Sequence, residues 1–133
     1  RLVLGRSNGL IGASSPALPL TILDAKFNAG GHFDHGVAPG HSQWMYAVSE
    51  SIEVSVGDEI VTIPAGDALA IRARQEPATL NLRAHADSHV VIVTGEPISE
   101  HFVQRGPFVM SNEAQIAKIE ADYRAGRFGK LSD

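Results

Sequence analysis

Short stretches of alternating apolar and polar residues run through most of the chain. Residues 51–56 alternate isoleucine and valine with serine and glutamate, the two-residue period of a half-buried strand. Gly57 and Asp58 follow and residues 59–63 return, which predicts a hairpin. The same reasoning predicts strands at residues 1–6, 20–27, 43–50, 67–73, 78–84 and 89–94. A series of short strands separated by turns is typical of a sandwich or barrel.

Two of these strands carry further information. Leu80 and Leu82 alternate with polar residues, which predicts one face in the core and one in water. Residues 90–93 are apolar on both faces, so we expect this strand to lie in the middle of a sheet.

A different period appears near the end of the chain and predicts one helix, at about residues 112–125. Asn112 is a suitable N-cap, Gln115 completes a capping box, and Gly126 is a natural residue just after a helix end. Three apolar residues recur on one face: Ile116, Ile119 and Tyr123. This stripe must pack on something, either the same barrel or another chain.

Composition narrows the possible classes of protein. A length of 133 residues is most simply one domain, and a net charge of −4 gives no general attraction to nucleic acid or membrane. The chain has no cysteine, which excludes disulfides and thiolate chemistry and fits a cytoplasmic protein. Since the sequence begins at Arg1 with what reads as a strand, we expect further sequence upstream.

Histidines are the first candidates for chemistry. His32, His35 and His41 fall within ten residues, and neutral imidazole is a common metal ligand. They lie among glycines and prolines, and no carboxylate stands at a convincing spacing, so we expect an exposed loop without a metal. His85, His89 and His101 are scattered, and each reads as a surface or hydrogen-bonded residue. No nucleophile motif, phosphate-binding loop or basic-aromatic pattern for nucleic acid is present.

One combination of motifs resembles the closing segment of the pirin family. That segment has a G-E-P element, a Q-x-G-P-F-V-M run, D-Y in an acidic helix, and G-x-F-G. The matching residues are Gly95-Glu96-Pro97, Gln104, Gly106-Pro107-Phe108-Val109-Met110, Asp122-Tyr123 and Gly126-Arg127-Phe128-Gly129. Upstream matches are Asn8-Gly9, Asp24, Pro39-Gly40-His41 and Tyr46. Ser111 departs from the family, which usually has asparagine there.

The resemblance implies a cupin-type double-stranded β-helix, or jelly-roll barrel, with one C-terminal helix. Pirins resemble bicupins, in which the N-terminal barrel holds a metal, usually Fe(II). The chain looks like the C-terminal half: a barrel at about 1–95, a strap at 96–111, the helix, and a tail at 126–133. Some family members are described as quercetin 2,3-dioxygenases and others as nuclear transcription cofactors, roles that belong mainly to the metal-bearing half.

The cupin motifs can be laid on this sequence. Anchoring the first motif on Gly31 places its ligand positions at Val37, Pro39 and Gln43. The second motif keeps its proline and glycine, but its histidine position is Leu69. These side chains are unsuited to iron, so we expect no metal in this barrel. A site built from His35, His41 and Gln43 stays as a weak alternative.

The sequence therefore predicts a degenerate, non-catalytic cupin half that packs beside a metal-bearing N-terminal cupin and presents surface to a protein partner. The candidate docking residues are the family signature and the helix stripe: Gly106, Pro107, Phe108, Val109, Met110, Ile116, Ile119, Asp122, Tyr123, Gly126 and Phe128. Alternatively, these residues cap their own barrel, the parent protein is an iron enzyme, or the chain is a stand-alone ligand-binding or transcription-partner module.

Overall fold

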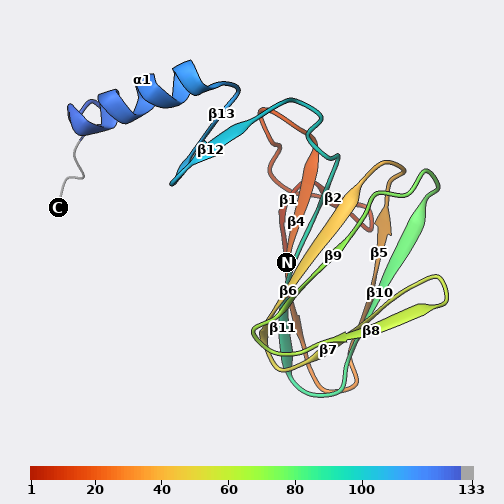
Figure 1. The fold of residues 1–133 in the computed structure, drawn as a ribbon. Coiled ribbons are helices and arrows are strands. Elements are labelled where there is room, and N and C mark those ends of the chain that lie inside the picture. The colour runs from red at the N-terminus through yellow and green to blue at the C-terminus, as the bar shows by residue number, and fades with distance from the viewer. Residues whose placement is uncertain (130–133) are drawn as a thin grey trace. The chain divides into compact units, whose positions relative to one another are not determined.

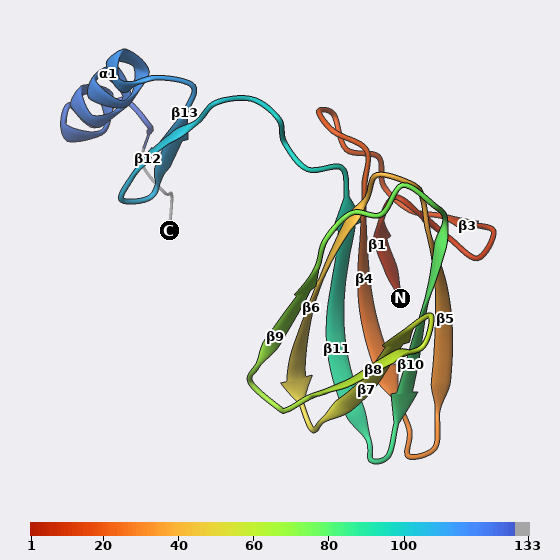
Figure 2. The ribbon, with the colours of Figure 1, turned by 45° about the vertical axis from the view of Figure 1, so that its right-hand side comes forward.

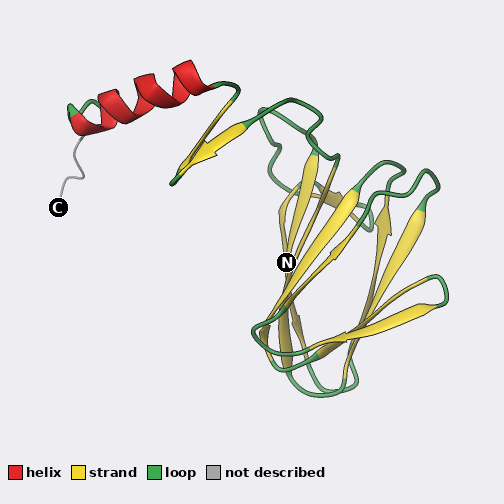
Figure 3. Ribbon diagram, in the orientation of Figure 1, coloured by secondary structure: helices red, strands yellow, loops and turns green. Residues whose placement is uncertain are grey.

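Strands and helix occupy different parts of the chain in the computed structural model, which describes residues 1–129 (Figure 1). The chain divides into two compact units, Arg1–Pro97 (unit 1) and Ile98–Asp133 (unit 2). Unit 1 contains strands and no helix, and α1 belongs to unit 2 (Figure 3). Within residues 1–129, no helix has both the length and the apolar character needed to cross a membrane.

Unit 1 is built from two antiparallel sheets that face each other (Figure 2). The five-stranded sheet has the order β1-β4-β11-β6-β9, with β1 at Leu2–Leu4, β4 at Leu20–Phe27, β11 at Ser88–Gly95, β6 at Ser42–Ser49 and β9 at Ala68–Ile71. The four-stranded sheet has the order β5-β10-β7-β8, with β5 at His32–Val37, β10 at Ala78–Ala84, β7 at Ile52–Val56 and β8 at Glu59–Ile63. Two short strands, β2 (Arg6–Ser7) and β3 (Leu10–Ile11), form a separate ribbon.

The core of unit 1 lies between the two sheets, where several strands bury every second residue. Alternation is clearest in β7 and β10, whose isoleucine, valine and leucine side chains are buried at every second position. The buried cluster consists of Leu23, Phe27, Val37, Met45, Ala47, Ile52, Val54, Val56, Ile63, Leu80, Leu82, Ala84, Val90 and Ile92. Both sheets contribute to it, so this core fastens them face to face.

Most of the strand predictions are confirmed. Strands β4, β8 and β10 have the predicted bounds, and β7 and β8 form the predicted hairpin. Gly57 adopts a φ of 62° in that turn. Strand β11 lies between β4 and β6, the central place expected from its apolar sequence.

Two expectations were wrong. Residues 1–6 are not one strand, because Gly5 has a φ of 85° and separates β1 from β2. A Cβ at Gly5 would stand 2.3 Å from the Leu20 carbonyl oxygen, so glycine is required by this close approach. The predicted exposed loop around His32 and His35 is instead strand β5, which pairs with β10.

Unit 2 consists of a hairpin followed by a helix: β12 (Val103–Arg105), β13 (Phe108–Met110) and α1 (Glu113–Arg124). Gly106, with a φ of 56°, occupies the hairpin turn. The Asn112 side chain accepts a hydrogen bond from the Gln115 backbone N–H at 3.0 Å, as its N-cap role predicts. Gln115 departs from the predicted capping box, because its Oε1 accepts from Ser111 N rather than from the N-cap N–H.

Candidate functional site

One polar side chain stands out inside the barrel. His35 is only 2% exposed, although it lies on a strand whose neighbouring positions carry glycine and aspartate. Its Nδ1 lies 2.9 Å from Ser7 Oγ, while its Nε2 is buried and has no hydrogen-bond partner among residues 1–129. Burial lowers the pKa of the His35 ring, because the charged form would lose its hydration. Burial thus favours the neutral form of the ring, in which one nitrogen is paired and the other has no partner among residues 1–129.

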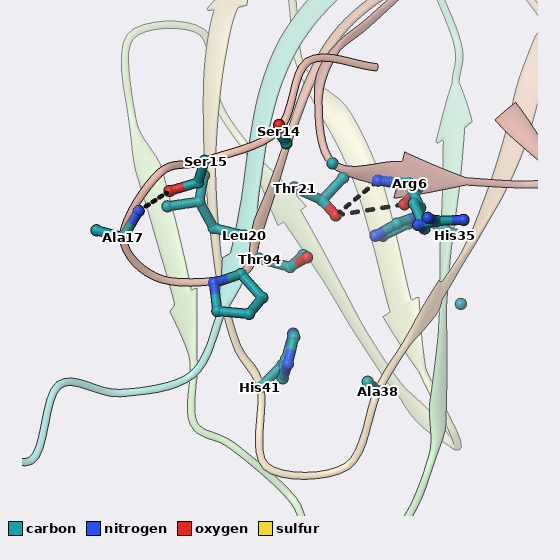
Figure 4. A pocket seen from close by; sticks show the side chains of 13 residues that line it. Arg6, Ser14, Ser15, Ala17, Leu20, Thr21, His35, Ala38, His41 and Thr94 are labelled. Atoms are coloured by element: carbon teal, nitrogen blue, oxygen red, sulfur yellow. Dashed lines mark hydrogen bonds between the residues drawn. The ribbon is translucent and has the colours of Figure 1, made fainter. Parts of the chain in front are cut away.

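A pocket of about 480 Å³ opens beside this histidine (Figure 4). Residues from β2, the segment before β4, the β5–β6 region and the end of β11 line it. None of the thirteen lining residues is acidic, in a chain with fifteen aspartates and glutamates. The polar lining residues are Arg6, Ser14, Ser15, Thr21, His35, His41 and Thr94.

His35 and His41, the weak alternative of the sequence analysis, do line the same pocket. Gln43 takes a different role, because it is buried and its Nε2 donates to the His41 carbonyl oxygen at 2.6 Å. That hydrogen bond ties the start of β6 to the preceding loop. Within residues 1–129, no three His, Asp or Glu side chains gather as a metal cluster.

The other positions that align with cupin ligands lie in the core, against the core or in a turn. Val37 is part of the buried core, and half-buried Leu69 packs against it. Pro39 is exposed in the turn between β5 and β6. Hydrocarbon and proline side chains offer no donor atom to a metal, so the residues present do not fit the iron that the cupin pattern implies.

The remaining histidines lie outside the pocket. His89 Nε2 and Asp24 Oδ1 are 2.5 Å apart on the outer side of the five-stranded sheet. This contact lowers the pKa of Asp24. His85 pairs with Glu53 at 3.3 Å, and His101 lies exposed in unit 2. His85 and His89 are thus hydrogen-bonded, one of the two roles that the sequence analysis expected for them.

The outer face of the five-stranded sheet carries an apolar row. Trp44 and Tyr46 stack with ring centroids 6.1 Å apart and an interplanar angle of 5°. Strand register places Val93 beside Trp44 and Val91 beside Tyr46. Trp44 is exposed and Tyr46 is half-buried, and accessible aromatic residues on a sheet face are more typical of a contact surface than of a solvated one.

The signature residues of unit 2 come together as structure. Phe108, Tyr123 and Phe128 form a three-ring cluster with centroid separations of 5.8, 5.9 and 6.3 Å. Asp122 accepts hydrogen bonds from Lys118 and Arg127, and these contacts lower its pKa. The motif thus fastens the hairpin, the helix and the chain after the helix to one another.

The helix stripe is covered unevenly. Ile116 is fully buried and Ile119 half-buried, but Tyr123 is 63% exposed. Gly126 has a φ of 68°, which suits its predicted place after the helix end.

Val109 is exposed, whereas Met110 and Phe108 are half-buried. A second pocket of about 400 Å³, lined in part by Phe102, lies within unit 2.

The sequence profile described as "Pirin C-terminal cupin domain" matches residues 22–129. The chain belongs to the pirin family. The Pseudomonas aeruginosa protein named "Putative quercetin 2,3-dioxygenase" is 31% identical over 128 residues, which cover 96% of this chain and 43% of that protein. The chain thus spans less than half the length of this relative.

Two solved structures share the fold of this chain. The quercetin 2,3-dioxygenase from Acinetobacter baumannii is 28% identical and superposes with a TM-score of 0.81 over 99% of this chain and 44% of that chain. The bacterial pirin YhhW from Escherichia coli, solved in complex with nickel(II), gives a TM-score of 0.56 at 21% identity, over 74% and 39% of the chains. The second comparison shows the fold alone.

Proposed function

We propose that this chain is the metal-free C-terminal cupin half of a pirin-like protein and that its role is structural, docking beside a metal-bearing N-terminal cupin. The observation that carries the proposal is that unit 2 buries few of its hydrophobic side chains. Among its described residues only one hydrophobic side chain, Ile116, is fully buried. Its exposed large hydrophobic residues are Ile98, Phe102, Val109, Tyr123 and Phe128.

Two further observations support this role. The four positions aligned with cupin ligands carry Val37, Pro39, Gln43 and Leu69, none of them suited to iron. The family match is to a C-terminal cupin domain, and relatives are more than twice as long as the matched region. On this proposal the remaining length of such a protein holds the N-terminal cupin, which is the partner that covers the apolar surface of unit 2.

Association of separately expressed halves tests the docking role. The N-terminal half of the parent would be titrated with the 133-residue chain and with a chain truncated after Glu100. We expect the truncated chain to bind at least about tenfold more weakly, because the apolar residues of unit 2 leave the interface. Binding of the truncated chain at full affinity would refute the proposal.

Point variants locate the surface within the chain. Tyr123→Ser removes an exposed aromatic ring from unit 2, and Trp44→Ser removes one from the outer sheet face. Ile60→Ser, at an equally exposed apolar residue of β8, is the matched control. We expect only Tyr123→Ser to weaken association. If only Trp44→Ser does so, the docking surface is the sheet face.

A second function follows from the similarity to quercetin 2,3-dioxygenases. On this alternative the parent protein is an Fe(II)-type dioxygenase whose site lies in the N-terminal half, and this chain supports that half without contributing a metal ligand. Metal analysis of each half after reconstitution with Fe(II) shows which half holds the iron. Stoichiometric iron retained by the 133-residue chain would overturn the ligand register given above.

A further inference from the structure

The unpaired nitrogen of His35 calls for an explanation. Buried side-chain nitrogens are nearly always hydrogen-bonded, since an orphaned polar atom destabilises the fold. Among residues 1–129, His35 Nε2 is the one buried side-chain nitrogen or oxygen without a partner. The ring that carries it lines the 480 Å³ pocket. Nε2 itself has almost no accessible surface, so a ligand seated in the pocket against this ring would supply the missing partner once the surrounding side chains move aside.

The Ser7–His35 pair lets the free nitrogen act as a donor. A serine hydroxyl can rotate to donate to Nδ1, and the neutral ring then carries its proton on Nε2. Burial disfavours the imidazolium form, so the ring presents one N–H rather than two. This tautomer suits a ligand that offers an oxygen acceptor.

The charge of the pocket favours an anionic acceptor. Arg6, which makes no ion pair within residues 1–129, lines the pocket together with His41, and no carboxylate lines it. Three further hydroxyl side chains can donate hydrogen bonds, those of Ser14, Ser15 and Thr94, whereas the Thr21 hydroxyl donates to the Arg6 carbonyl oxygen. In Figure 4, Arg6, Thr21 and His35 lie on one side of the pocket, and the His41 ring approaches from another. The apolar part of the wall consists of Pro19, Leu20 and two alanines, Ala17 and Ala38.

We propose that this pocket is a binding site for a small organic carboxylate with an apolar body. The carboxylate accepts hydrogen bonds from the Arg6 guanidinium and from His35 Nε2–H, and the apolar body lies against the Pro19 and Leu20 side of the wall. The volume falls in the range of small-molecule sites. This ligand role is independent of docking to an N-terminal cupin, and it requires no metal.

Benzoate is a suitable probe, with benzamide as its neutral analogue of nearly equal shape. Binding to the 133-residue chain would be followed by NMR, using the ring nitrogens and carbon-bound protons of His35. We expect benzoate to give saturable shifts at His35 and to fix the proton on Nε2. Benzamide should bind at least about tenfold more weakly, because it lacks the charge that pairs with Arg6.

Matched variants make the test decisive. Arg6→Ala should weaken benzoate binding about tenfold, whereas Arg83→Ala, which removes an exposed guanidinium that does not line the pocket, should leave it unchanged. Since Arg6 is exposed, its loss should leave the fold intact, which the Trp44 signals would verify. Equal effects of both variants, equal binding of benzoate and benzamide, or no saturable shift at His35 would each overturn the proposal. Association with the N-terminal half is measured separately, so failure of one proposal is distinguishable from failure of the other.

Discussion

Unit 1 and unit 2 differ in how far they bury their apolar side chains. Unit 1 buries fourteen hydrophobic residues in one contiguous cluster between two sheets. The described part of unit 2 buries Ile116 fully and leaves large hydrophobic side chains such as Phe102 and Tyr123 exposed. The barrel thus has a core of its own, whereas the hairpin and helix have mainly one aromatic cluster and a few ion pairs.

The difference teaches where each unit gets its stability. A segment of fewer than about 40 residues rarely buries enough apolar surface to fold without a disulfide, a metal or a partner. The chain has no cysteine, so no disulfide can supply this stability. We therefore expect unit 1 to fold on its own and unit 2 to depend on a surface that covers it.

The largest expected effect is on the core of unit 1. Leu82→Ala should lower the free energy of unfolding by about 2–5 kcal/mol, because it leaves a cavity between the sheets. Urea unfolding followed by the fluorescence of Trp44, the single tryptophan, measures it. The control Leu10→Ala, at an exposed residue, should change stability by less than about 0.5 kcal/mol. Equal effects at both positions would contradict the core assignment.

Ile116→Ala tests whether the two units unfold independently. This substitution removes the one fully buried hydrophobic side chain of the described part of unit 2, so we expect much of the helical circular dichroism to disappear. The Trp44-monitored transition of the barrel should shift by less than about 0.5 kcal/mol. A shift of several kcal/mol in that transition would show that unit 2 stabilises the barrel directly.

Ser7→Ala has an intermediate expected effect within unit 1. It leaves both ring nitrogens of His35 without a partner, which should destabilise the barrel by about 1–3 kcal/mol. Ser14→Ala, at an exposed serine that lines the pocket, is the control and should be nearly neutral. If the two variants unfold alike, the Ser7–His35 hydrogen bond contributes little to stability.

The smallest expected effect is a pH dependence confined to the barrel. Burial lowers the pKa of His35 in the folded state, so the unfolded chain takes up this proton more readily. Stability should therefore decrease as the pH falls from about 7.5 through the ordinary histidine range near 6.5. His35→Gln should flatten this part of the profile relative to His32→Gln, an exposed neighbour on β5.

The carboxylates act in a separate pH window. Hydrogen bonds to basic partners lower the pKa values of Asp24 and Asp122 below 3.8, so their contributions are lost only in more acidic solution. A profile between pH 7.5 and 5.5 that is identical for His35→Gln and His32→Gln would contradict the role given to His35.

Much of this protein could be predicted from the sequence by itself. Alternating residues define strands such as β7 and β10, and Asn112 and Gly126 bound the helix, because these signals depend on near neighbours in the chain. The pirin signature was also readable as a motif. Its closing residues proved to be those that pack and pair within unit 2, such as Phe108, Asp122 and Phe128.

Only the tertiary structure decided what the residues around His35 do. The segment "HFDHGV" shows no strong apolar period, and it became a strand because β10 pairs along its whole length. The pocket joins Arg6, His41 and Thr94, residues far apart in sequence that meet because the strands close into a barrel. His35 is buried, and its Nε2 has no hydrogen-bond partner among residues 1–129, because of those distant neighbours. No local sequence pattern specifies them.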